Sequence, residues 1–225
     1  MATQFANGKI VTSGLVLALD AADRNSYVSG SSIWNDVSGN GNGGTLTNGP
    51  TFSNNSIVFD GVDDSVICTN NSSVQITTGT IIAWINANSN NTSFRGIITK
   101  QSAWGLFLFN NLLVAYDWGN SQIRSTGINL GNNAWNYVAM SFTETIGTPS
   151  NNAIIYIRGR ELENQNYQLT TTVKHVDQNT TVQVGDGNAS QFFSGKIPIV
   201  QIYNRALSTQ EILQNYNLQK SRFNL

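Results

Sequence analysis

Residues able to carry out nucleophilic chemistry are scarce in this 225-residue chain. His175 is the only histidine and Cys68 the only cysteine, so a serine or cysteine nucleophile would have a single imidazole to activate it. Cys68 ends the strand-like run Val66–Cys68, where a small buried apolar side chain is the expected role. The sequence contains neither a phosphate-binding glycine loop nor a zinc-ligand spacing. These observations argue against nucleophilic and zinc-dependent catalysis.

The glutamates offer one close pair, Glu161 and Glu163, in a turn-like stretch. Retaining hydrolysis of a glycosidic bond needs two carboxyl groups about 5–5.5 Å apart. The pair lacks a further acidic residue close behind it in the same stretch, and Glu211 belongs to a helix cap. We therefore predict that the protein is not an enzyme.

Carboxylate and amide oxygens on loops could bind calcium, which takes about 6–8 oxygen ligands. The candidates are Asp36, Asn40, Asp60, Asp63, Asp64 and Asp186. The alternative is that these side chains are solvated and cap their own turns, as aspartate and asparagine often do. We favour this alternative, so no cofactor is predicted and calcium remains the competing hypothesis.

Aromatic residues beside amides suggest a different chemistry, the binding of sugars. A sugar packs its apolar face on an aromatic ring while neighbouring polar groups bind its hydroxyls. The candidates cluster around one expected hairpin: Trp104, Tyr116, Trp118 and Asn120. Packing in the core is the alternative, and it is the expected role of Trp34, Trp84 and Trp135. Trp118 is the best candidate, because it stands at a strand end.

The elements that would position these residues are almost all strands. Short apolar runs recur between turn-forming clusters, which predicts an all-β antiparallel sandwich. Asp60-Gly61 and Asn110-Asn111 are tight-turn signals. Near the end, Ser208 and Glu211 form a capping box that starts a short helix. We predict one domain over residues 14–218, an N-terminal arm at 1–13 and a C-terminal tail at 219–225.

The composition of the chain limits the classes of partner that it can be expected to bind. Charged residues make up only 11% of the chain and the net charge is −1, which disfavours nucleic acid and anionic membranes as partners. No apolar run reaches the ~20 residues of a membrane span. The N-terminus lacks the basic and apolar pattern of a secretion signal. We expect synthesis in the cytoplasm and no membrane insertion.

The segment Phe193–Tyr216 closely resembles the end of laminin-G-like domains of the concanavalin A-like lectin/glucanase superfamily. Gly14–Asp20, Ser56–Val66, Gly79–Ile85 and Trp135–Phe142 match earlier strands of that family in order. The resemblance implies a jelly-roll fold. The family's glucanases carry a Glu-x-Asp-x-(x)-Glu strand that is missing here. Its calcium-binding members often carry an acidic pair where this chain has Pro198-Ile199.

The opening of the chain, including Gly8–Thr12, Gly14–Asp23 and Trp34–Asn42, resembles laminin-G-like proteins of tailed bacteriophages. This resemblance implies a structural protein of the virion, made in the host cytoplasm: a capsid decoration or cement protein, or a fibre or neck component. Its partners would be other virion proteins and further copies of itself. The alternative is a lectin-like adhesion module that binds host surface polysaccharide.

Apolar residues outside the expected core suggest contacts with a partner. They are Phe5, Ile10, Val11, Phe223 and Leu225. With no evident place in a jelly roll, they are predicted to mediate assembly. Deletion of residues 1–9 or 219–225 is therefore expected to leave the sandwich folded.

Overall fold

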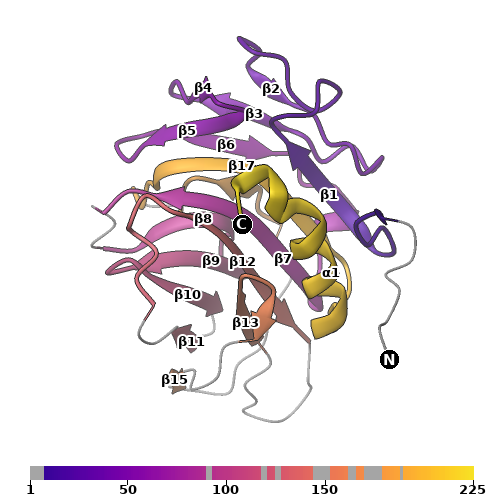
Figure 1. Ribbon diagram of the computed structural model, residues 1–225, viewed down its shortest axis with the longest axis vertical. Coiled ribbons are helices and arrows are strands. Elements are labelled where there is room, and N and C mark those ends of the chain that lie inside the picture. Colours follow the sequence, from indigo (N-terminus) through magenta and orange to yellow (C-terminus); the bar gives the residue numbers. More distant parts are fainter. Residues whose placement is uncertain are drawn as a thin grey trace.

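The computed structural model contains two antiparallel β-sheets packed face to face, with one helix across the outer face of the first sheet (Figure 1). It describes residues 8–89, 93–117, 121–124, 128–143, 153–161, 166–169, 179–187 and 190–225, and for 116–117, 121–124 and 166–169 the backbone alone. The prediction of an all-β sandwich with a short C-terminal helix is confirmed. No helix in these ranges has the length and apolarity needed to cross a membrane.

Sheet A has the strand order β14, β13, β12, β7, β17, β5, β4, and β1 also pairs with β17. Its strands are β1 (Leu15–Asp20), β4 (Thr51–Ser53), β5 (Ser56–Asp60), β7 (Gly79–Ala87), β12 (Trp135–Phe142), β13 (Ala153–Ile157), β14 (Arg160–Glu161) and β17 (Ser194–Tyr203). The closing strand β17 is long enough to pair with β5 near its start and with β1 near its end.

Sheet B has the order β15, β11, β10, β9, β8, β16, β6, β3, β2. Its strands are β2 (Ile33–Trp34), β3 (Gly44–Thr47), β6 (Ser65–Cys68), β8 (Arg95–Lys100), β9 (Trp104–Phe109), β10 (Leu112–Asp117), β11 (Ser121–Arg124), β15 (Asn166–Leu169) and β16 (Val182–Val184). A short 3-10 helix, η2 (Ser72–Val74), follows β6.

The two turn signals have different outcomes. Asn110 and Asn111 join β9 to β10 with φ values of 51° and 61°, as a two-residue hairpin turn requires. The chain also turns at Asp60-Gly61, with a φ of 83° at Gly61, but this turn joins β5 of sheet A to β6 of sheet B and does not close a hairpin. The chain crosses between the sheets there, since β5 already has β4 and β17 as its neighbours.

Apolar side chains occupy both faces of sheet A. Along β7, Ile81, Ala83 and Ile85 belong to the core between the sheets, whereas Ile82 and Trp84 belong to a second apolar cluster. This alternation follows from the two-residue period of a strand. The second cluster needs a cover, and the C-terminal helix supplies it.

The cover consists of helix α1 (Thr209–Gln219) and the 3-10 helix η3 (Lys220–Phe223). The predicted capping box is confirmed: the Glu211 backbone N–H donates to the Ser208 hydroxyl, and the Glu211 carboxylate accepts from the Ser208 backbone N–H. Arg205 forms an ion pair with Glu211 at 2.6 Å. On the buried side of α1, Ile212 packs into the second cluster.

The expectation that Phe223 and Val11 have no place in the fold is wrong. Phe223 is 8% exposed and packs within the second cluster, and Val11 packs at the edge of that cluster. The Val11 backbone N–H donates to Asn215 Oδ1 at 2.8 Å. Sequence reasoning missed these contacts because they cover the outer face of sheet A rather than the core between the sheets.

The other predicted assembly residues are placed differently. Ile10 is half-buried, Leu225 is 44% exposed, and Phe5 lies outside the described residues. Assembly through them remains a prediction.

Candidate functional site

The aromatic cluster predicted around the β9–β10 hairpin does not form a surface site at Trp104. Its side chain is 0% exposed and packs in the core between the sheets, with its ring centroid 6.2 Å from that of Phe142. A ligand cannot stack on a ring in this position, so Trp104 is corrected to a core residue. Trp118, Asn120 and the side chain of Tyr116 lie outside the described residues.

Three of the predicted calcium ligands come together in the crossing loop. Carboxylate oxygens of Asp60, Asp63 and Asp64 lie within 4.8 Å of one another. Asp60 Oδ1 accepts from the Val62 backbone N–H at 2.7 Å, and Asp64 Oδ2 accepts from the Asp60 backbone N–H at 3.0 Å. Burial raises the pKa of Asp64, a hydrogen bond from Asp60 opposes this shift, and the charges of Asp60 and Asp63 raise the pKa further.

Asp36 does not join this group. Its carboxylate accepts hydrogen bonds from the backbone N–H groups of Ala18, Ser38 and Asn42. It therefore ties the loop after β2 to strand β1. Asn40 makes a similar structural contact, donating to the Leu15 carbonyl oxygen at 3.2 Å.

The glutamates show no arrangement for hydrolysis within the described residues. Glu161 is exposed in β14 and Glu211 is engaged in the helix cap, while Glu163 lies outside the described residues.

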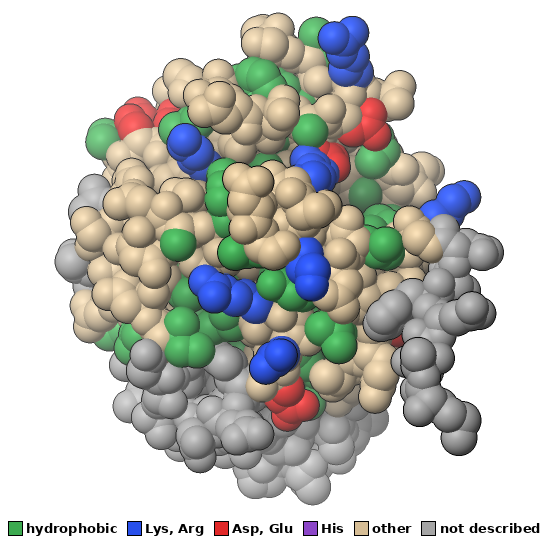
Figure 2. All heavy atoms as spheres, viewed as in Figure 1, with side chains coloured by type: hydrophobic (Ala, Val, Ile, Leu, Met, Phe, Trp, Pro, Cys, Tyr) green, Lys and Arg blue, Asp and Glu red, His purple; other side chains and the backbone are tan. Residues whose placement is uncertain are grey.

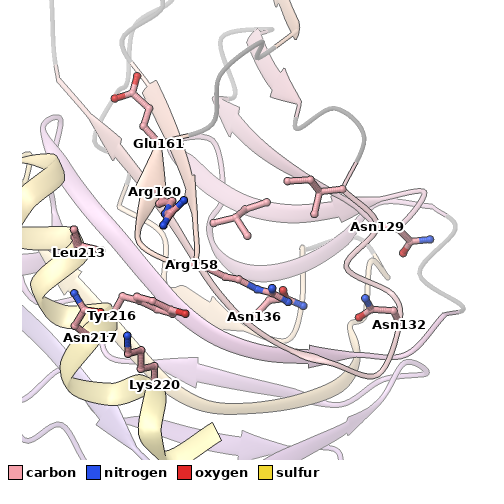
Figure 3. Close-up of a pocket in the computed structure, with 12 residues that line it drawn as sticks. Asn129, Asn132, Asn136, Arg158, Arg160, Glu161, Leu213, Tyr216, Asn217 and Lys220 are labelled. Carbon is pink, nitrogen blue, oxygen red and sulfur yellow. The ribbon is translucent and has the colours of Figure 1, made fainter. Parts of the chain in front are cut away.

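A pocket of about 640 Å³ lies where α1 meets the β13–β14 hairpin and the loop before β12 (Figure 3). Its lining combines one aromatic ring, several amides and several charged groups. The lining residues are Ile128, Asn129, Asn132, Asn136, Ile157, Arg158, Arg160, Glu161, Leu213, Tyr216, Asn217 and Lys220. We call it the Tyr216 pocket.

The turn Arg158-Gly159 brings the hairpin against the helix. Both residues have left-handed backbones, with φ values of 53° and 73°. A Cβ on Gly159 would lie 2.8 Å from Tyr216 Cβ, so only glycine allows this close approach. The Arg158 backbone N–H donates to the Tyr137 carbonyl oxygen at 2.8 Å, which ties the turn to sheet A.

Tyr216 is held in place by other aromatic rings. It stacks on Trp84 with centroids 5.8 Å apart, and it meets Tyr137 edge to face at 5.7 Å. The Lys220 ammonium lies 5.5 Å from the Tyr216 ring centroid. Figure 3 shows the Tyr216 side chain reaching from α1 into the pocket, with Lys220 beside it. The ring is a rigid, half-buried platform.

Amide groups surround this platform. Asn132 Oδ1 accepts from the Ala134 backbone N–H at 3.1 Å, and Asn136 Nδ2 donates to the Ala134 carbonyl oxygen at 3.1 Å. Each side chain thus uses one polar atom to shape the loop. Asn217, on α1, makes no side-chain hydrogen bond to any described residue.

A smaller pocket of about 400 Å³ is lined in part by the η3 residues Arg222 and Phe223, and we call it the Trp135 pocket. It is lined by Asn54, Asn55, Asn86, Trp135, Lys196, Arg222 and Phe223. Asn86 and Trp135 are paired residues of β7 and β12, and Asn86 also pairs with Lys196 of β17. Strands β12, β7 and β17 therefore hold an indole, an amide and an ammonium group side by side.

The sandwich, its covering helix and its recessed surface define a protein of the lectin-like β-sandwich class. The chain belongs to the concanavalin A-like lectin/glucanases superfamily, whose laminin-G family model matches residues 60–213. No curated protein sequence matches the chain.

Solved structures with a similar fold include the binding domains of two toxins and an enzyme. The binding domain of Paraclostridial mosquitocidal protein 1 has a TM-score of 0.61 at 18% identity, over 91% of this chain and 52% of that one. The receptor-binding domain of botulinum neurotoxin C/D mosaic serotype has a TM-score of 0.64 at 15% identity, over 93% and 52%. Trypanosoma rangeli sialidase in complex with the inhibitor DANA has 0.67 at 14%, over 92% and 33%.

These similarities concern the fold. The chain spans about half the length of the two toxin structures and a third of the sialidase.

Proposed function

We propose that the protein is a non-enzymatic carbohydrate-binding module. The observation that carries the proposal is the Tyr216 pocket, where an aromatic ring fixed by Trp84 and Tyr137 faces a recess lined by amides. Its volume of about 640 Å³ falls in the range typical of small-ligand sites. An aromatic platform takes the apolar face of a sugar, and amide groups both donate to and accept from its hydroxyls.

The two toxin structures with a similar fold, one a binding domain and the other a receptor-binding domain, support a binding role for this fold. Catalysis is not proposed for this pocket, because Glu161 is the single carboxylate among the described residues that line it. Glycoside hydrolysis ordinarily uses two carboxyl groups.

A glycan array tests the proposal with the intact protein and two matched asparagine variants. Asn217→Ala removes an amide from the pocket, whereas Asn35→Ala removes an exposed amide elsewhere. We expect the first to weaken binding and the second to leave it unchanged. Binding to no glycan, or equal signals for the two variants, would refute the proposal.

We further propose that the module serves as a structural protein of a bacteriophage virion, as a decoration or cement protein or in a fibre or neck. The support is the resemblance of Gly8–Thr12, Gly14–Asp23 and Trp34–Asn42 to laminin-G-like phage proteins. In this setting the partners are other virion proteins and further copies of the chain, and the glycan is on the host surface. Mass spectrometry of purified particles would detect the protein, and its absence from them would exclude this role.

A further inference from the structure

We infer that the ligand is an acidic polysaccharide whose sugar units occupy the Tyr216 pocket and the Trp135 pocket together. This inference rests on the proposed carbohydrate-binding function and specifies its substrate class. The relevant chemistry is a chain of sugars bearing carboxylate or sulfate groups.

Positive charge is concentrated around the two pockets. Among the described residues that line them are five cations, Arg158, Arg160, Lys196, Lys220 and Arg222, and one carboxylate, Glu161. The whole chain has 12 lysines and arginines and a net charge of −1, so this concentration is local. Figure 2 shows lysine and arginine side chains gathered across the middle of this face of the molecule.

Most of these cations are free to bind an anion. Arg158, Arg160, Lys196 and Lys220 form no ion pair with any described residue. Arg222 differs, since its guanidinium is held by Asp20 through two hydrogen bonds of 2.6 and 2.9 Å. An arginine fork matches the geometry of a carboxylate or sulfate group, which makes Arg158 and Arg160 suitable partners for acidic sugars.

The two pockets repeat the same chemistry. Each has an aromatic ring for the apolar face of a sugar, Tyr216 in one and Trp135 in the other. Each also has asparagine amides for hydroxyl groups and at least one cation without a described carboxylate partner. Two similar sites fit a polymer that presents the same unit repeatedly.

Residues of one short helix, η3, line both pockets. Lys220 lines one pocket and Phe223 the other, at the two ends of the single-turn helix η3. A ligand that crosses η3 can therefore contact both recesses.

Other polyanions fit less well. A nucleic acid would favour a cationic stripe on a chain of basic net charge, and an anionic membrane attracts clusters of basic residues on an amphipathic or juxtamembrane helix. Here the cations border recesses lined by amides, on a chain of net charge −1. This arrangement favours a ligand that carries hydroxyl groups as well as charge.

Titration calorimetry with the full chain tests the inference against four probes: alginate with carboxylates, λ-carrageenan with sulfates, neutral dextran, and single-stranded DNA. Three charge-matched variants are compared. Arg160→Gln alters the Tyr216 pocket, Lys196→Gln alters the Trp135 pocket, and Arg24→Gln removes an exposed cation elsewhere.

We expect alginate or λ-carrageenan to bind more tightly than dextran, and the binding to weaken as salt is added. Arg160→Gln and Lys196→Gln should each reduce the affinity about tenfold, the usual effect of losing a hydrogen bond to a charged group. Arg24→Gln should have no effect.

Different failures have different meanings. In one, dextran binds as tightly as the acidic polysaccharides, and its binding is lost in Asn217→Ala and kept in Arg160→Gln. That result would overturn the inference of an acidic ligand and would leave the proposed carbohydrate binding intact. Unchanged polymer binding in Lys196→Gln would overturn the two-pocket arrangement. Tighter binding of DNA would replace the polysaccharide with another polyanion, and binding of none of the polysaccharides would refute the proposed function as well.

Discussion

The ring of Phe223 stacks on the indole of Trp84, with centroids 4.0 Å apart and an interplanar angle of 22°. The indole N–H of Trp84 donates to Gln219 Oε1 at 2.8 Å in a buried hydrogen bond. The last residues of the chain therefore complete the outer face of sheet A. They also contribute lining residues to both pockets, Lys220 to one and Arg222 and Phe223 to the other.

Replacement of Phe223 should destabilise the fold. Phe223→Ala is expected to lower the free energy of unfolding by about 2–4 kcal/mol. The side chain of Phe223 is 8% exposed, and its removal would leave the indole of Trp84 uncovered. Leu225→Ala is the control, since Leu225 is 44% exposed and should change stability by less than about 0.5 kcal/mol. Urea unfolding measures both. Equal stabilities would show that the stacked rings contribute little.

The helix cap should make stability depend on pH. Hydrogen bonds from Arg205 hold the pKa of Glu211 at about 2, below its usual value near 4.5. The stabilisation is therefore complete above about pH 4.5 and is lost as the pH falls towards 2. Glu211→Gln should cost about 1 kcal/mol at pH 7, allowing for solvent screening, and almost nothing at pH 2. A difference that does not vary with pH would contradict this role for the ion pair.

Gly159→Ala should separate backbone strain from close packing. The new alanine would have a φ of 73°, and its methyl group would lie 2.8 Å from Tyr216 Cβ. We therefore expect the free energy of unfolding to fall by about 2–3 kcal/mol. Gly39→Ala has a similar φ of 89° with nothing within 4 Å, and should cost only the strain, about 1 kcal/mol. Thermal melts of the two variants that coincide would show that α1 does not need this close contact.

Cys68 should be chemically inert in the folded protein. Burial, together with the charge of Asp36, raises the pKa of its thiol to about 12, so almost no thiolate exists at pH 8. A disulfide reagent such as DTNB should label it only at the rate of unfolding. Rapid labelling of the native protein would place the thiol at an accessible position.

Calcium should have little effect on stability. Asp60 and Asp64 accept hydrogen bonds from their own loop, and the closing strand has Pro198-Ile199 where calcium-binding relatives often carry acids. Melting curves in calcium and in chelator should nearly coincide. A native-state site at about 100-fold excess over Kd would add about 2.7 kcal/mol. A shift of that size, abolished by Asp63→Ala, would establish a calcium site.

Features that depend on neighbouring residues could be predicted from the sequence. The Ser208 capping box and the Asn110-Asn111 turn are examples, because each is formed within four residues. The strands followed from their apolar patterns. The burial of Trp104 could not be read in this way, since an aromatic residue in a strand has the same local pattern whether it faces the core or solvent.

The Tyr216 pocket could not be predicted for a different reason. Its lining comes from three separate segments, residues 128–136, 157–161 and 213–220, which meet only when the helix covers sheet A. One local signal was present: Arg158-Gly159, between two strand-like runs, marks a tight turn. The sequence does not show that this turn contacts α1.

Binding of an acidic polysaccharide across the two pockets is tested most directly by an NMR titration of the labelled protein with oligosaccharides of alginate and of λ-carrageenan. We expect at least one of them to shift the indole N–H signal of Trp135 and the side-chain amide signals of Asn132 and Asn217, which line the two pockets. The indole signal of the buried Trp104 should not move. Shifts confined to sheet B, for example at Ile67 and Gln183, with none at Trp135 or Asn217, would contradict the account.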